Sequence, residues 1–538
     1  MAGSKYVSKF IKENAPPAHN GTILAGRVLP ESFKPPFGDA WGYLESGSIM
    51  EEHSHPTEEI YIVVNGTGFC HVGGERFTVA PGDVVEIPPG MPHTMECLEG
   101  ETLLWAAFWW EREEELLSVL GEGDAGVPDE KLIETLKAAV DKSGPSLIKV
   151  LILPPDYSRL HSAGGKITAM LVKYLREKYG SKIDVMPALG THERLSAGEA
   201  AEFFGPEIDY DKLIVHDWRN DVVKLGEVPA SFVREISEGL MDERVDVEVN
   251  RRVVDKAYDL VISVGQVVPH EVVGMANHNK NIFVGCGGSS MISSSHMLGA
   301  FYGLEKMMGK ADTPVRKLFN YAEDNFLRGV PLLYLLTVTT AENGRAKIHG
   351  LFAGRGRNTF TEAVKLSQKK NMIYVAEPLK KVVVFLDGQE FKSTWIGNKA
   401  VYRTRMAIAD GGELIVLAPG VSKFGEDKEN DRLIRKYGYV GRERVLGLFG
   451  ENDDLRQNRS VPAHLIHGSS DGKFSITYAV KKLTRDEVTG VGFKYADYDE
   501  TIKKYDPAKL TAGRNILDDG EEIYFIPNPA VGLWVYEP

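Results

Sequence analysis

The chain has 538 residues, of which 43% are hydrophobic and 26% charged, a composition typical of a globular protein with more than one domain. Its net charge of -13 argues against nucleic acid or an anionic membrane as the main partner, because both attract basic surfaces. The three cysteines form no CxxC pair, the N-terminal segment lacks the apolar stretch of a signal peptide, and the apolar run at 103–110 is too short to cross a bilayer. These features predict a soluble protein of a reducing compartment, the cytoplasm.

The first part of the chain has the pattern of a small all-β barrel. Runs rich in β-branched and aromatic residues, such as EIYIVVNG and RFTVAPGDVVEIPPG, are separated by Gly and Pro turns. The next segment, EREEELLSVLGEGDAGVPDEKL, predicts a short charged helix followed by a linker. We therefore assign residues 1–122 to the first domain.

Strands and helices alternate in the remainder of the chain. LIKVLILPP, KIDVMPALG and YDLVISVG are apolar strands, GGKITAMLVKYLREKYG is an amphipathic helix, and Ser196 with Glu199 forms a capping-box signature. Continuous apolar strands between helices indicate a parallel sheet covered on both faces. The pattern returns in KKVVVFLDG and GGELIVLAPG and ends in a β-rich tail, so we expect two α/β domains, 123–325 and 326–538, with the active site between them.

The β-rich part contains a candidate metal site. His53 and His55 share one face of a strand because alternate residues point the same way. Glu59 and His93 add a carboxylate and a third imidazole. Three nitrogens and one oxygen suit Zn, Fe, Mn, Ni or Cu, so the ligands predict a divalent transition metal without selecting one.

The segment with His53, His55 and Glu59 and the segment with His93 resemble the two cupin motifs, over roughly residues 35–112. The one departure is Cys97, which stands where a polar residue often closes the second motif. The resemblance implies a metal-binding jelly-roll barrel. It does not imply an activity, because cupins include isomerases, oxygenases and binding modules.

Polar side chains follow three strands of the predicted parallel sheet. Asp156 and Arg159 come after the first strand, His192 after the second and His270 after the third. Open α/β sheets bind ligands at this edge, so an arginine and two histidines there predict an anion-binding acid/base site. The loop after the third strand is neither a zincin helix, because Gly274 stands where the second histidine is needed, nor a phosphate loop.

The motifs DYSR, GTHER, PHEVVGMANHNK and SSSH resemble, in order and spacing, those of the lactate racemase family of nickel-pincer-dependent 2-hydroxyacid racemases and epimerases, over most of residues 145–425. The resemblance implies that Lys280 carries a covalent nickel-pincer nucleotide and that His296 binds its nickel. It further implies the following roles: His192 and His270 as the acid/base pair, Arg159 with Asp156 for the substrate carboxylate, and Lys365, with Glu362 one turn earlier, as the pocket lysine of the second domain.

The residue types suit that reaction. Inverting C2 requires a hydride to leave and return while a base holds the hydroxyl proton, and two imidazoles serve the two enantiomers near neutral pH. Arginine grips a carboxylate bidentately, and the cofactor supplies the hydride chemistry. His296 is expected just inside the N-terminus of the helix SSHMLGAFYGLEKMM, whose positive end favours anionic groups.

The sequence departs from the family around the substrate. MANHN, with an extra imidazole at His278, replaces a Gly-rich run, Val284 replaces a proline, and Glu362 stands where an amide is usual. No tryptophan follows IVLAPG, and Phe424 is the nearest aromatic residue. These changes predict a substrate larger or more hydroxylated than lactate, such as a sugar acid.

Two other functions stay open. The cupin itself could act as a metal-dependent sugar isomerase or oxygenase with the α/β region as a substrate-binding scaffold, or the protein could sense a hydroxyacid without turning it over. The expected partners are a small hydroxyacid and the cofactor-synthesis enzymes, and the sequence leaves a homo-oligomer open. His464 and His467 fit no motif and are expected in a tail that completes the second domain.

Overall fold

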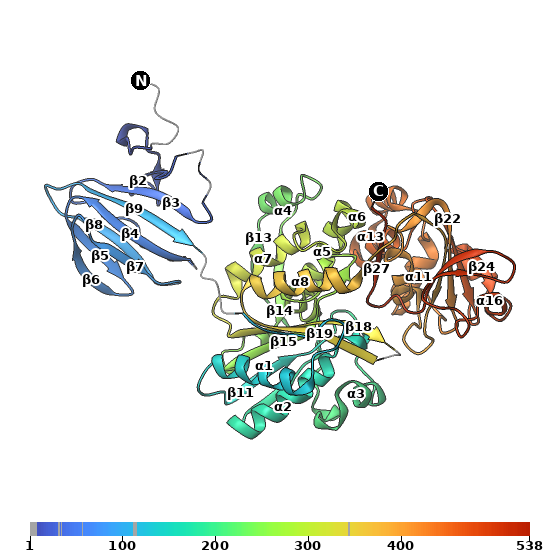
Figure 1. Ribbon diagram of the computed structural model, residues 1–538. Helices are drawn as coiled ribbons and strands as arrows, with labels where there is room; N and C mark the ends of the chain where they lie inside the picture. Colours follow the sequence, from blue (N-terminus) through green and yellow to red (C-terminus); the bar gives the residue numbers. More distant parts are fainter. Residues whose placement is uncertain are drawn as a thin grey trace. The chain divides into compact units, whose positions relative to one another are not determined.

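The computed structural model describes residues 8–30, 33, 35–55, 57–110, 116–342 and 345–537. The chain divides into two compact units, residues 1–114 and 115–538 (Figure 1). The first unit is all-β and the second is α/β, which confirms the predicted fold class. Among the described residues, every helix is too short or too polar to span a bilayer.

The first unit consists of two antiparallel sheets that enclose one core. Buried side chains from both sheets, among them Tyr61, Met95 and Trp105, form a single cluster, as in a jelly roll. The six-stranded sheet has the order β1 (Pro17–Ala18), β2 (Ile23–Gly26), β3 (Gly38–Leu44), β9 (Leu103–Trp110), β4 (Glu58–Asn65), β7 (Val84–Ile87), and the three-stranded sheet the order β6 (Glu75–Val79), β5 (Gly68–Val72), β8 (His93–Cys97).

The second unit begins with a six-stranded sheet whose four adjacent strands β12, β11, β15 and β18 are parallel, as predicted. Helices cover both faces, with α1 and α2 on one side and α5, α7 and α8 on the other (Figure 1). The strands are β10 (Leu117–Leu120), β19 (Arg345–Gly354), β18 (Leu332–Glu342), β15 (Leu260–Gln266), β11 (Lys149–Leu153) and β12 (Lys182–Val185), and the helices are α1 (Asp129–Lys142), α2 (Gly164–Tyr179), α3 (Ala197–Phe204), α4 (Ala230–Ile236), α5 (Ser289–Tyr302), α6 (Leu304–Met307), α7 (Pro314–Phe326) and α8 (Arg357–Asn371), with the small pairs β13 (Val222–Val228) and β14 (Val245–Asn250), β16 (Pro269–His270) and β17 (Gly274–Met275).

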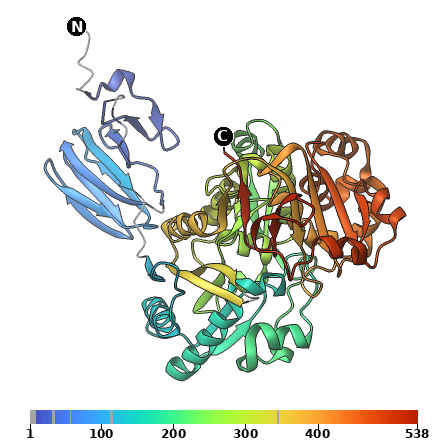
Figure 2. The same cartoon turned by 45° about the vertical axis from the view of Figure 1, so that its right-hand side comes forward.

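A second α/β sheet follows, coloured orange to red in Figure 2. Its strands are parallel except β25 at one edge, and the last strand of the chain, β27, returns to pair with β20. The strands are β24 (Lys494–Asp497), β23 (Ser475–Val480), β22 (Ile408–Ala418), β21 (Leu379–Phe385), β26 (Glu522–Ile526) and β25 (Gly513–Ile516), with β20 (Met372–Tyr374) and β27 (Leu533–Val535), and the helices are α9 (Thr394–Gly397), α10 (Lys399–Tyr402), α11 (Lys428–Tyr437), α12 (Arg442–Glu451), α13 (Asp453–Gln457), α14 (Ser460–His467), α15 (Arg485–Gly490) and α16 (Tyr498–Lys504).

Both predicted domain boundaries are shifted by the sheet pairing. Residues 117–120, expected in a charged helix or linker, form β10 and pair with β19, while 111–115 lie outside the described residues. The strands β18 and β19 and the helix α8 also belong to the first α/β domain, although they follow residue 326. The reason is that the apolar run LLYLLTVTT completes the parallel sheet beside β15, so the second α/β domain begins after α8.

The first α/β motif forms as its sequence predicts. Helix α2 ends at Gly180, whose φ of +64° suits glycine, and Ser196 with Glu199 forms the expected capping box at the start of α3. The two helices approach closely at Gly165, where a Cβ atom would lie 1.8 Å from the carbonyl oxygen of Phe203. This contact fixes α3 against the helix that follows the Asp156 loop.

Two glycine variants test that contact. Gly165→Ala should lower the free energy of unfolding by about 1 to 3 kcal/mol, because a backbone carbonyl cannot move aside as a side chain can. Gly198→Ala, in the first turn of α3 with nothing within 4 Å of the added carbon, should be neutral or stabilising by up to about 1 kcal/mol. Urea denaturation compares the two, and equal stability of both variants would contradict the packing described.

Candidate active site

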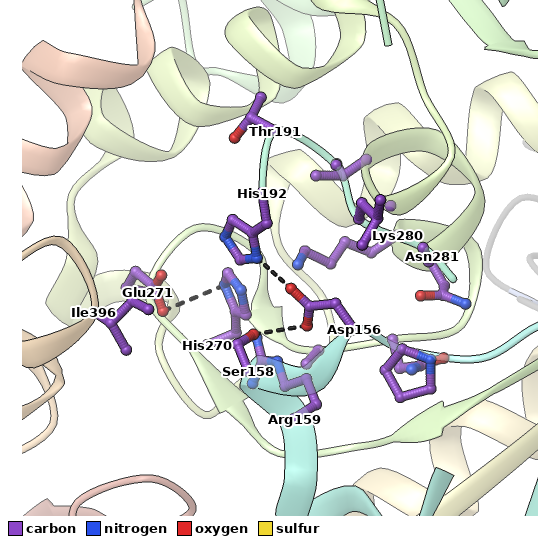
Figure 3. A pocket seen from close by; sticks show the side chains of 18 of the residues that line it. Asp156, Ser158, Arg159, Thr191, His192, His270, Glu271, Lys280, Asn281 and Ile396 are labelled. Atoms are coloured by element: carbon purple, nitrogen blue, oxygen red, sulfur yellow. Dashed lines mark hydrogen bonds and ion pairs between the residues drawn. The ribbon is translucent and has the colours of Figure 1, made fainter. Parts of the chain in front are cut away.

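A cavity of about 160 Å³ lies at the carboxyl ends of β11, β12 and β15, closed on its other side by α9 and α10 of the second α/β domain (Figure 3). The structure therefore brings together residues that sequence analysis placed on separate loops. Those that line the cavity are Asp156, Arg159, His192, His270, Lys280 and His296 from the first α/β domain, and Trp395, Lys399, Tyr402 and Arg403 from the second.

His192 is held by Asp156. The carboxylate accepts a hydrogen bond from Nδ1 of His192 and another, of 2.7 Å, from the hydroxyl of Ser158 (Figure 3). Burial would raise the pKa of Asp156, but the imidazole outweighs it and lowers this pKa to about 2. Burial would likewise lower the pKa of His192, yet the charge of Asp156 raises it above the ordinary value. The ring, still 36% exposed, thus presents a basic Nε2 to the cavity.

His270 has the opposite electrostatic setting. The backbone N–H of Val272 donates to its Nδ1 at 3.1 Å, so a neutral ring carries its proton on Nε2. Burial, followed by the positive charges of Lys280 and Arg159, lowers the pKa of His270 well below its usual value. The two imidazoles therefore differ in electrostatic setting, with the pKa of His192 raised and that of His270 lowered.

Lys280 stands at the start of a short π-helical turn, Asn281–Gly285. The amide of Asn281 donates to the carbonyl of Leu153 at 3.1 Å and to the hydroxyl of Ser263 at 3.0 Å, which ties the turn to the end of β11 and the middle of β15. Among the described residues, the Lys280 amine has no hydrogen-bond or ion-pair partner, and burial and then Arg159 lower its pKa to about 8. A fraction of this amine is neutral near pH 7, which is what a covalent tether needs.

The loop before Lys280 is clamped from beneath by Arg316, which is only 3% exposed. Its guanidinium donates to the carbonyls of Met275 and Asn277 at 2.7 and 3.1 Å and to the side chain of Asn279. Asn277 and His278 have φ values of +64° and +57°, the left-handed conformation that glycine adopts freely. The MANHN sequence thus forms this turn with two strained residues, whereas a Gly-rich run would form it without strain.

The extra imidazole of this loop does not reach the cavity. The ring of His278 is buried and stacks on Tyr334, with 4.0 Å between ring centroids. Burial and then the charge of Arg316 lower the pKa of His278 well below its usual value. His278 is therefore a neutral part of the core.

His296 lies in the middle of α5, and not just inside its N-terminus as expected, because the helix begins seven residues earlier at Ser289. Its Nδ1 donates to the carbonyl of Ile292 at 2.6 Å, so Nε2 keeps its lone pair. Burial lowers the pKa of His296 to about 4 and keeps the ring neutral. A neutral imidazole with one free nitrogen is the form that ligates a metal.

Glu362 and Lys365 do not reach the cavity, which corrects the expectation that they complete it. They lie on the outer face of α8 and pair with each other at 2.6 Å, and the Lys365 side chain is 65% exposed. The opposite face of α8, with Phe360 and Val364, packs on the first α/β sheet. Their spacing along the helix therefore directs both charges toward solvent.

The cavity takes its second lysine from α10 instead. Lys399 is buried, and burial lowers its pKa to about 8. Trp395 supplies the aromatic wall, whereas Phe424 is fully buried in the core of the second domain. Sequence analysis missed this segment, TWIGNKAVYRTR, whose signal is a lysine and two arginines among apolar residues in the loop after β21.

Trp395 is backed by a residue of the C-terminal tail. His464 stacks on it with 4.3 Å between ring centroids and accepts or donates a hydrogen bond with the Tyr439 hydroxyl at 2.9 Å. His464 and His467 lie in helix α14, so the tail completes the second domain with helices as well as strands. The tail therefore helps to position the cavity wall.

The cupin histidines form a separate cluster within the first unit. His53, His55 and His93 each offer one nitrogen, and these atoms lie within 4.8 Å of one another. Glu59, only 5% exposed, approaches Nε2 of His55 at 2.8 Å and Nε2 of His93 at 3.3 Å. Burial lowers the pKa of His53 to about 4, and the hydrogen bond to Glu59 raises that of His55.

The rings of His53, His55 and His93 are oriented by the same kind of hydrogen bond. Each Nδ1 donates to a backbone carbonyl, which leaves each Nε2 to face the cluster. The donors and acceptors are His53 and Glu51 at 3.1 Å, His55 and Thr57 at 3.1 Å, and His93 and Met91 at 2.9 Å. Three imidazole nitrogens and a buried carboxylate fit a divalent transition metal.

Known protein families match both the β-rich first unit and the α/β second unit. Residues 41–110 match the cupin domain family and residues 130–307 match the lactate racemase N-terminal domain family. The α/β unit thus has a lactate racemase-type fold preceded by a cupin. The chain is therefore similar to the cupin domain family in its first unit and to the lactate racemase N-terminal domain family in part of its second unit.

Solved structures share this fold. A Thermotoga maritima protein superposes with a TM-score of 0.66 at 24% identity, covering 77% of this chain and 100% of its own. The lactate racemase apoprotein of Thermoanaerobacterium thermosaccharolyticum superposes with a TM-score of 0.57 at 17% identity, covering 78% and 100%. An uncharacterized protein of Methanocaldococcus jannaschii is 44% identical over 80 residues, which is 14% of this chain, and the match spans 63% of that relative.

The ion pair of Asp156 and His192 predicts a shift in histidine titration. In Asp156→Asn, burial acts on His192 without the opposing carboxylate, so the pKa of His192 should fall below the ordinary value and the ring should be neutral at pH 7. Titration of ring-labelled histidine by NMR measures this. Ser158→Ala, which leaves the carboxylate in place, should keep the pKa of His192 raised, and an unchanged titration in Asp156→Asn would contradict the assignment.

The buried amine predicts a gain in stability on its removal. Because the pKa of Lys280 is lowered to about 8, the charged amine disfavours the folded state fully below pH 8, and this cost fades as the pH rises toward 10.5. Lys280→Met should therefore raise the free energy of unfolding of cofactor-free protein by about 1 to 3 kcal/mol at pH 7, with a smaller gain at pH 9.5. In urea denaturation, the exposed Lys365→Met should change stability by less than about 0.5 kcal/mol, and a destabilised Lys280→Met would contradict the prediction.

Proposed function

We propose that the protein is a racemase or 2-epimerase that inverts C2 of a 2-hydroxyacid with a nickel-pincer nucleotide tethered to Lys280. One observation carries the proposal. The unpartnered amine of Lys280 opens into the same cavity as His192 and His270 (Figure 3), and His296 also lines this cavity. A structural lysine would instead pair with a carboxylate or reach solvent.

The residues present fit such a group. Lys280 would hold it covalently, and Nε2 of His296 would ligate its nickel. When bound, the group would supply the acceptance and return of a hydride at C2. The remaining tasks, which are binding the acid, orienting it and moving the hydroxyl proton, fall to side chains of the chain itself.

The substrate carboxylate has a binding partner in Arg159. Within the described part of the chain, its guanidinium makes no hydrogen bond or ion pair, and it lines the cavity next to Asp156. A planar guanidinium holds a carboxylate through two parallel hydrogen bonds. Lys399 adds a second positive charge from the opposite wall.

The proton has two carriers. As a hydride leaves C2, one imidazole takes the hydroxyl proton and a flat 2-keto acid results. The same imidazole or the second one returns the proton when the hydride comes back to either face. His192 and His270 come from different loops. A neutral His192 can take the hydroxyl proton at Nε2, whereas His270, with its proton on Nε2, is set to return one.

A second, larger cavity favours a substrate longer than lactate. This chamber of about 770 Å³ shares Asp156, Ser158, His192 and Ile396 with the first cavity. Its wall is rich in hydrogen-bonding groups, which suit the hydroxyls of a sugar-acid tail. They include Glu199, Gln389, Glu390, Lys392, Glu426 and Asn528.

Activity assays test the proposal directly. Full-length protein made together with the cofactor-synthesis enzymes should gain mass on Lys280 and epimerise one or more aldonic acids in a panel that includes lactate. Lys280→Ala should lose both the mass and the activity, and His192→Ala or His270→Ala should lower kcat by about 100- to 10,000-fold. Lys365→Ala should be unchanged, and turnover of lactate alone would contradict the larger substrate.

The cupin cluster supports a second candidate, a metal-dependent sugar isomerase or oxygenase in which the α/β unit only binds substrate. In that case His53→Ala should abolish turnover and Lys280→Ala should retain it, the reverse of our expectation. Hydroxyacid binding with neither turnover nor added mass on Lys280 would instead identify a sensor.

A further inference from the structure

A fourth histidine of the first unit lies against the metal cluster, outside the segment that resembles the cupin motifs. The ring of His19 packs on that of His53 with 4.1 Å between centroids. Within the described residues, neither nitrogen of the His19 ring has a hydrogen-bond partner.

The turn that carries His19 has a strained backbone. His19 and Asn20 both have positive φ values, +49° and +54°, between the short strands β1 and β2. Left-handed backbone is costly for a histidine, so something must hold the turn in place.

The anchor is Glu51, two residues before His53. Asn20 donates to both carboxylate oxygens of Glu51 at 2.8 and 2.7 Å. The backbone N–H of Glu51 donates to the hydroxyl of Thr22 at 3.0 Å, and this hydroxyl donates to the His19 carbonyl at 2.6 Å. The clamp joins the His19 turn to the segment that presents the first ligand.

The histidine cluster contains ring nitrogens that form no hydrogen bond within the described residues. Nε2 of His93 is buried and lies 3.3 Å from the Glu59 carboxylate without forming a hydrogen bond, as expected where a bound metal would satisfy both groups. The three clustered histidines fix Nδ1 on carbonyls, whereas both nitrogens of His19 remain available.

We propose that His19 is a fourth imidazole ligand of the cupin metal, completing a set of four nitrogens and the carboxylate of Glu59. A six-coordinate metal would then keep one open position where three histidines and Glu59 alone leave two. The N-terminal turn thus covers the cluster and restricts which small ligands reach the ion.

Cobalt binding by the full-length, cofactor-free protein tests this. Co²⁺ absorption in the visible range reports coordination number, and X-ray absorption counts imidazoles. His19→Ala should weaken Co²⁺ binding by about 10- to 100-fold, the loss seen when groups supporting a metal site are removed. It should also reduce the count from four imidazoles to three and change the visible spectrum, and added free imidazole should restore that spectrum.

Matched variants locate the effect. His71→Ala removes another partly exposed histidine of the same unit, one that pairs with Glu96 at 3.1 Å away from the cluster, and should bind Co²⁺ like the wild type. His53→Ala should abolish the signal, which assigns it to the cupin and not to His296. Asn20→Ala, which releases the turn but keeps the imidazole, should weaken binding less than His19→Ala.

Wild-type affinity and spectrum in a folded His19→Ala variant would overturn the proposal, as would only three imidazoles in the wild type. Circular dichroism checks that the variant is folded. The result does not depend on racemase activity, because the probe is the metal alone.

Discussion

The candidate site of the α/β unit depends on buried positive charge that the two carboxylates lining the cavity, Asp156 and Glu271, offset only in part. Arg159, Lys280, Lys399 and Arg403 line one cavity, and burial lowers the pKa of both lysines to about 8. Such a cluster disfavours folding, so its persistence indicates a functional demand. An anionic substrate and a lysine converted to an uncharged linkage would both relieve the repulsion.

This charge is held in place by buried polar contacts from both α/β domains. Arg316 and Asn281 fix the Lys280 turn from the first domain, while Arg403 donates to the carbonyl of Pro269 at 3.0 Å, next to His270. The second donor of Arg403 reaches Gly532 near the chain terminus. Removal of such a buried donor leaves carbonyls without partners, so the positions of Lys280 and His270 depend on these donors.

Sequence patterns predicted the site residues that directly follow the strands of the first α/β sheet. Asp156, His192 and His270 were placed correctly at one sheet edge because apolar strands and the residues after them are both local patterns. Lys365 was misplaced because family spacing outweighed the helix pattern, in which Phe360 and Val364 mark the buried face. Trp395 and Lys399 were missed because the second domain reaches the cavity through tertiary packing, and the charged residues of their segment do not by themselves say which cavity they line. The boundary after residue 325 failed for the same reason, since β18 and β19 join a sheet begun far earlier in the chain.

In both candidate metal centres, the backbone orients the histidine rings in the same way. In His53, His93 and His296, Nδ1 donates to a carbonyl within four residues, so the backbone fixes which nitrogen remains free. Burial lowers the pKa values of His53 and His296 to about 4, so these two rings are neutral and can bind a metal without first losing a proton. His192 is built for the opposite purpose, because its Nδ1 faces a carboxylate that keeps the ring basic. The partner of Nδ1, a carbonyl or a carboxylate, therefore separates the candidate metal ligands His53, His93 and His296 from His192, the proposed proton carrier.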